Sequence, residues 1–174
     1  MLGLKLSAAL ATLVFTAGVA MAQGAKPNDA QIAHIAYTAG NIDIAAAQQA
    51  LKKSKNKQVR AFAQDMVRDH KAVNDKALAL VKKLKVTPED NPTSQSLKKD
   101  ADAKLAQYAK LNGAEYDKTY AQNEVAYHQT VNGAVQGTLI PSAQNPELKS
   151  LLETGLKIFQ GHQQHAEQLA ASLK

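Results

Sequence analysis

The chain has 174 residues, with 21 Lys and Arg against 15 Asp and Glu and a formal net charge of +6 at pH 7. This length predicts a single domain, and the hydrophobic share of 45% excludes an intrinsically disordered chain. Because the sequence contains no cysteine, disulfides, zinc–thiolate sites, thiol nucleophiles and iron–sulfur clusters are excluded, and histidine and carboxylate side chains remain for any chemistry.

Residues 1–22 have the pattern of a secretory signal peptide. Lys5 precedes an apolar run from Leu6 to about Ala20, and Ala20-Met21-Ala22 provides a small-x-small cleavage pattern. The run is short for a membrane anchor, which must span about 30 Å. No cysteine follows it to carry a lipid. We therefore expect export to the periplasm, cleavage before Gln23, and a mature domain of residues 23–174 without a transmembrane segment.

The remaining sequence has the hydrophobic period of a helix and no sustained alternation typical of strands. We predict helices over about 28–53, 56–85, 93–110, 114–136 and 146–174, with loops at 86–92 and 137–145. Asn145, Pro146 and Glu147 combine a cap, a first-turn proline and an acidic first turn, which is a strong helix start. Four long helices and one short one predict an all-α fold, an antiparallel four-helix bundle with the short helix in the middle connection.

Lysines gather near predicted helix ends, at 52–57 and 82–85. This position indicates that the lysines offset the helix dipoles at the C-terminal ends of the helices. The alternative is that they contact an anionic envelope surface. No aromatic residues are interleaved with these lysines, so no nucleic-acid partner is predicted.

Six ionisable side chains fall on the predicted buried faces of the four long helices: Asp43, His70, Asp117, Glu124, His128 and His162. Burial of such groups without partners costs several kcal/mol. Imidazoles and carboxylates that converge inside a bundle form metal sites, and this donor set suits Fe, Zn, Mn, Ni or Cu(II). The alternative is a hydrogen-bonded polar network that binds no metal.

Counting the helical rise from each predicted turn places these residues at different levels. The expected centre comprises His70, His162, Glu124 and Asp117, with His128 and Asp43 at the edge or in a second shell. Two other histidines, His34 and His165, are predicted to lie outside. Asp65 and Asp69 are expected to make local ion pairs.

Three segments resemble a family described as domain of unknown function 4142. Val59 to His70 is similar to its V-x-x-F-A-x-x-M-x-x-D-H segment, Tyr116-Asp117 with Tyr120 and His128 to its F-D-x-x-Y…H segment, and the helix around His162 to its closing helix. The resemblance implies an exported bacterial protein with a ferritin-like fold, often labelled an outer-membrane protein.

Two positions depart from the family pattern: Asp43 stands where the family usually has Glu, and Lys157 where it has Pro. The paired Glu-x-x-His motifs of di-iron proteins are not in the sequence, so ferroxidase activity is not implied.

Two functions follow as hypotheses. The first is an exported, periplasmic, ferritin-like bundle that binds a transition metal in an envelope or stress role. The second is a non-catalytic envelope interaction or structural protein whose buried polar groups bind no metal. The sequence has no nucleophile elbow, no His-Glu-x-x-His and no phosphate-binding glycine loop, so it does not predict a hydrolase.

Overall fold

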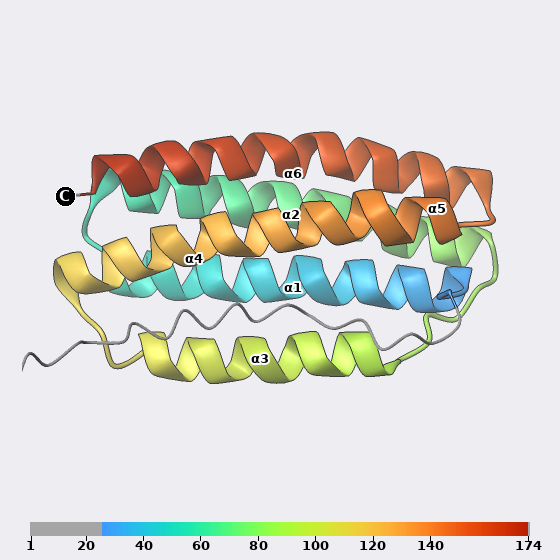
Figure 1. Ribbon diagram of the computed structural model, residues 1–174, viewed down its shortest axis with the longest axis horizontal. Helices are drawn as coiled ribbons and strands as arrows, with labels where there is room; N and C mark the ends of the chain where they lie inside the picture. Colours follow the sequence, from blue (N-terminus) through green and yellow to red (C-terminus); the bar gives the residue numbers. More distant parts are fainter. Residues whose placement is uncertain (1–25, 174) are drawn as a thin grey trace, which may run out of the picture.

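The computed structural model describes residues 26–173, and within them the chain is helical, with no strand. The predicted all-α class is confirmed; the predicted signal peptide, residues 1–22, lies outside the described residues. Figure 1 shows the long helices lying side by side along the long axis of the molecule. The elements are α1 (Asp29–Lys53), α2 (Lys57–Lys83), α3 (Pro92–Tyr108), α4 (Gly113–Ala134), the π-helix η1 (Val135–Leu139), α5 (Ile140–Ser142) and α6 (Pro146–Ser172).

Asparagine caps set the starts of α1, α2, α3 and α6. The side chains of Asn28, Asn56, Asn91 and Asn145 accept hydrogen bonds from backbone N–H groups in the first turn of these helices. Such a cap contributes about 1 kcal/mol. The predicted starts of α1 and α6 are confirmed. The predicted cap of the short helix at residue 93 or 94 is wrong, because Asn91 caps it and Pro92 fits the first helical position.

Four helices enclose a common interior. α1 packs against α2 and α4, α6 packs against α2 and α4, and α3 lies mainly against α1. One apolar cluster contains Phe62, Met66, Tyr116 and Tyr120, and a second contains Ile32, Leu139, Leu148 and Leu152. Among residues 26–173, each helix is too short or too polar to cross a lipid bilayer.

Between these two apolar clusters lie five buried ionisable residues, which we call the polar layer: Asp43, His70, Glu124, His128 and His162.

The connection between α4 and α6 differs from the prediction. Residues 137–145 were expected to form a loop, whereas the chain stays helical through η1 and α5 to Ser142. Pro141 has no N–H to donate within a helix, and just before it the Ile140 N–H donates to the Val135 carbonyl five residues back. The wider turn accommodates the proline without ending the helix. The true turn is therefore confined to residues 143–145.

Gly40 brings α1 close to α2 beside the polar layer. A Cβ atom at residue 40 would overlap the side chain of Asn74, which is buried and donates from Nδ2 to Asn41 Oδ1 at 3.0 Å. A Cβ atom at Gly133, on the exposed face of α4, would meet nothing within 4 Å. The two glycines therefore form a matched pair for testing this helix contact.

We expect Gly40→Ala to lower the free energy of unfolding by about 1–3 kcal/mol, because it overpacks the α1–α2 contact. Gly133→Ala is expected to raise it by up to about 1 kcal/mol through helix propensity. Urea denaturation followed by circular dichroism measures both. Equal effects of the two substitutions would contradict the close approach at Gly40.

Candidate metal centre

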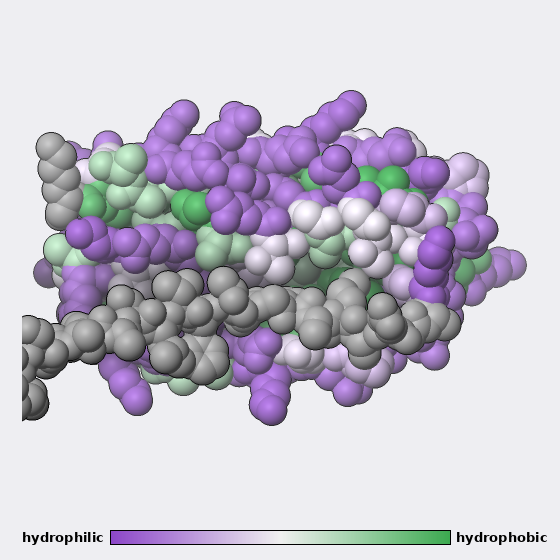
Figure 2. Space-filling view, in the orientation of Figure 1, coloured by the Kyte–Doolittle hydropathy of each residue, from purple (hydrophilic) through white to green (hydrophobic). Residues whose placement is uncertain are grey.

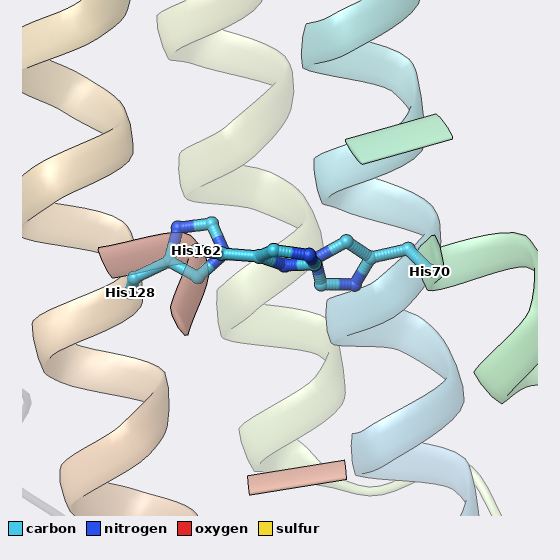
Figure 3. A group of neighbouring side chains, drawn as sticks. All are labelled: His70, His128 and His162. Carbon is cyan, nitrogen blue, oxygen red and sulfur yellow. The ribbon is translucent and has the colours of Figure 1, made fainter. Parts of the chain in front are cut away.

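The five residues of the polar layer reach the interior from four helices. Asp43 lies on α1, His70 on α2, Glu124 and His128 on α4, and His162 on α6. Each is at most 7% exposed. The three imidazole rings point toward one another (Figure 3), with ring centroids 5.2–5.7 Å apart.

The donor atoms of the layer form two groups of three that share His128, each compact enough to hold a metal ion. One ligand atom from each of the three histidines lies within 4.8 Å of the other two, and the same is true of Asp43, Glu124 and His128. Asp43 Oδ2 lies 3.2 Å from His70 Nε2 and 3.3 Å from His128 Nε2. Donors at 2.0–2.1 Å from a tetrahedral ion lie about 3.3 Å from one another. These residues therefore fit a metal ion of that size.

Hydrogen bonds fix which nitrogen of two imidazoles faces the layer. His128 Nδ1–H donates to the Glu124 carbonyl oxygen at 2.9 Å, which leaves the Nε2 lone pair free. His162 Nε2–H donates to Asp69 Oδ2 at 3.0 Å, which leaves Nδ1 with the lone pair. Both free nitrogens are buried and have no hydrogen-bond partner in the protein. A hydrogen bond on the opposite nitrogen is the arrangement that orients metal-binding histidines.

Burial keeps the imidazoles of the layer neutral. It lowers the pKa of His128 to about 4 and the pKa of His70 well below its ordinary value, with His128 and His162 lowering the latter further. The pKa of His162 is also lowered by burial. Neutral imidazole is the form that binds a metal.

The two carboxyl groups of the layer have no positively charged partner of their own. Burial raises the pKa of Asp43 to about 8, and burial together with Asp43 raises the pKa of Glu124 well above its ordinary value. Within residues 26–173, the groups at ion-pair distance from these carboxylates are histidines. Both oxygens of Asp43 and both oxygens of Glu124 lack a hydrogen-bond partner in the protein. Each carboxyl group therefore needs a proton or a cation to be stable there.

The structure brings together five of the six predicted site residues. Asp117 is buried on α4 but belongs to neither group of converging ligand atoms. His34 is half-buried, with Nδ1 3.7 Å from Asp90, and His165 is exposed. These two histidines lie outside the layer, as the sequence predicted.

The predicted levels within the site were wrong for His128 and Asp43, which lie at its centre rather than at its edge. The extension of α4 moves the middle of the turn from residue 141 to residue 144, so that His162 faces about residue 126 instead of residue 120. On α2, the His70 side chain leans toward the helix N-terminus and thus toward the level of Asp43. The first shift follows from the length of the connection between α4 and α6, and the second from the tilt of side chains in any α-helix.

Asp69 is a site residue that the sequence analysis assigned only to a local pair. It does bind Arg68, by hydrogen bonds of 2.7 and 2.9 Å, but its carboxylate also accepts from His162 on α6. The hydrogen bond from Arg68 is the main cause that lowers the pKa of Asp69, and His162 lowers it further. The sequence offers one indication of this role: Asp69 is adjacent to His70. Adjacent residues of a helix face different neighbours, so Asp69 can contact another helix than the one His70 faces.

Comparisons with known proteins agree with the fold. A family model described as Domain of unknown function (DUF4142) matches residues 15–169. A crystal structure of a DUF305 fragment from Deinococcus radiodurans is similar, with a TM-score of 0.73, 15% sequence identity, and coverage of 83% of this chain and 95% of that chain. The structure of CopM in the Cu(II)-bound form has a TM-score of 0.64, 13% identity, and coverage of 86% and 99%. No match was found among the curated proteins.

We expect the metal-free protein to lose stability as the pH rises from 6.5 to 8. A carboxyl group with a raised pKa in the folded state, about 8 for Asp43, keeps a proton that the unfolded chain has lost, so its contribution to stability disappears as pH rises through that value. Asp43 contributes to this decline together with Glu124, and one such group changes the stability by at most about 1.36 kcal/mol per pH unit. The unfolded chain's histidines, with ordinary pKa values near 6.5, are half protonated at pH 6.5 and become largely neutral by pH 7.5, so the decline is steepest in the upper part of this window.

Urea unfolding in EDTA at several pH values between 6.5 and 8 measures the slope. Asp43→Asn is expected to reduce it, whereas His165→Gln, on the exposed face of α6, keeps it. A stability that stays constant or rises over this window would contradict the protonated state of the buried acids.

Proposed function

This chain belongs to the family of domain of unknown function DUF4142, and we propose that it is an exported, periplasmic protein that binds one transition-metal ion in its polar layer. The proposed architecture is a ferritin-like antiparallel four-helix bundle in which α3 is the added short helix. Binding of the ion serves an envelope or stress role rather than catalysis. Asp43, His70, His128 and His162 would hold the ion.

One observation carries this proposal: buried donor groups from four helices form two converging groups of three that share His128, and their facing atoms lack hydrogen-bond partners in the protein. A purely structural network would pair these atoms with one another, because an unpartnered buried polar group costs about 1–3 kcal/mol. Instead, Asp43 Oδ2 and the two Nε2 atoms lie at 3.2 and 3.3 Å without hydrogen-bond alignment. The charges of the layer also support a bound metal ion, since a divalent cation would balance the negative charges of the Asp43 and Glu124 carboxylates.

The donor set narrows the class of metal. Three imidazoles and a carboxylate, without thiolates, suit Zn, Fe, Mn, Ni or Cu(II). CopM, whose fold is similar, was determined in a Cu(II)-bound form, which makes Cu(II) one of the first ions to test here. The low identity to CopM transfers no individual ligand to this chain.

We expect the protein purified without a His-tag to contain or take up about one metal ion per chain. His128→Gln and, separately, His70→Gln should weaken binding at least about 100-fold, because each removes an imidazole donor. Elemental analysis and competition titration with Zn(II), Cu(II) and Fe(II) measure stoichiometry and affinity. His165→Gln, on the exposed face of α6, is the matched control and should bind as the unmodified chain does.

Metal binding to the folded state should also raise the melting temperature. At a free metal concentration of 100 times the Kd, the free energy of unfolding should increase by about 2.7 kcal/mol. Less than about 0.1 ion per chain, together with a melting temperature unchanged by any of these ions, would reject the proposal. The polar layer would then be a structural network, as in the alternative function.

Asp69→Asn tests how His162 is oriented. The carboxylate accepts from His162 Nε2 and so holds Nδ1 toward the layer. We expect the amide to lower metal affinity about 10–100-fold, the range seen when such outer partners are lost. Competition titration measures the change, and Asp65→Asn, which removes only a salt bridge to Arg68, is the control. Equal affinities of the two variants would contradict a positioning role for Asp69.

A further inference from the structure

An apolar cavity adjoins the polar layer on the side of the second apolar cluster. Its volume is about 390 Å³, within the range of about 300–1,000 Å³ that is typical of small-molecule sites. Residues of α1, α2, α3, α4, η1 and α6 line it, so it lies within the molecule between the helices. Figure 2 shows hydrophobic surface recessed among polar residues in the half of the molecule that contains α5.

Small side chains create this space. Ala39, Gly40, Ala77, Ala134 and Gly155 all line the cavity, at positions where the helices face one another. In the other half of the molecule, Phe62, Met66 and Tyr120 are buried in the first apolar cluster, together with alanines of α1, α2, α4 and α6. The cavity therefore lies where alanines and glycines stand among larger apolar residues such as Leu139, Leu152 and Phe159.

The cavity has one polar end. His70 and His128 line it at the polar layer, and Asn74 lies beside them. His70 is 3% exposed, and neither of its ring nitrogens has a hydrogen-bond partner in the protein. Its ring stacks on Phe159, another lining residue, at a centroid distance of 4.6 Å. A molecule in the cavity would thus meet largely apolar walls and, at its inner end, the buried polar side chains of His70, His128 and Asn74, of which His70 has both ring nitrogens unpartnered.

Charge selects the class of molecule. Of the residues that the structure describes, no lysine or arginine lines the cavity, and the carboxyl groups of Asp43 and Glu124 lie just beyond its histidines. An anionic head group would find no cation there and would approach two acids, and a cationic head group would have to cross apolar walls. An uncharged head group, by contrast, can exchange a hydrogen bond with a neutral imidazole.

We propose that this cavity binds an uncharged, mostly apolar small molecule with one hydrogen-bonding group, such as an alcohol or phenol, directed toward His70. This site goes beyond the proposed metal function and does not require the ion. The apolar body of the ligand fills the space that the alanines and glycines leave, and its single polar group reaches the unpartnered imidazole.

Fluorescence of N-phenyl-1-naphthylamine, a neutral apolar probe, tests the site in EDTA-treated protein. We expect saturable binding and displacement by 1-decanol at a concentration at least tenfold lower than by decanoate at pH 8. Ala134→Leu on α4 and, separately, Ala77→Leu on α2 fill the cavity and should each weaken probe binding at least tenfold. Ala126→Leu, on the exposed face of α4, should leave binding unchanged.

Circular dichroism shows whether each variant folds, and the two filling variants lie on different helices so that one can replace the other. Metal content of the filling variants should equal that of the unmodified chain, which separates this site from the metal site. Probe binding unaffected by both filling variants, or displacement by decanoate as effective as by decanol, would overturn the proposal. Absence of probe binding with a dimer in size-exclusion chromatography would overturn it in favour of a second copy covering this face.

Discussion

The removal of two carboxyl groups and three imidazoles from water is the constraint on which the structure depends. The layer formed by Asp43, His70, Glu124, His128 and His162 crosses the whole interior and separates two apolar clusters. Those clusters must supply the free energy that holds the layer out of solvent. Because no Lys or Arg of residues 26–173 lies at ion-pair distance from these carboxyl groups, burial favours their protonated, neutral form, and a bound cation would take the place of those protons. Cation binding in this layer is therefore linked to proton release.

Much of the fold could be predicted because its signals are local. The caps at Asn28 and Asn145 and the helical hydrophobic period act within a few residues, and the structure confirms them. Pro141 could not be interpreted in this way, because a proline marks a loop and a first helical turn equally well. The π-helical hydrogen bond from the Ile140 N–H to the Val135 carbonyl has no recognisable pattern in the sequence. The continuation of the helix to Ser142 was therefore not predicted from the sequence.

The same distinction applies to the site. Which face of a helix bears His70 or His162 depends on 100° steps along one helix, and these predictions agree with the buried positions found. The level at which two helices meet depends on the length of the turn between them. An error of three residues in the middle of the turn changes the facing residue by six, or about 9 Å along the helix, more than the spacing between neighbouring ligands. The contact between Asp69 and His162 lies beyond local patterns for the same reason, since it joins α2 to α6.

The alanines and glycines that line the cavity leave space unfilled beside the polar layer. Leucines in place of Ala39 or Ala77 would fill this space and add buried apolar area, which commonly stabilises a fold. The cavity ends at His70, a residue that also belongs to the polar layer. If both proposed ligands contact this imidazole, the affinity for each depends on the presence of the other, and by linkage the effect is reciprocal. A neutral imidazole has one N–H and one lone pair, so an alcohol that accepts from the N–H of His70 would leave the lone pair for a metal ion and orient the ring toward it. The free volume beside the layer thus connects an uncharged ligand to a charged one through a single side chain.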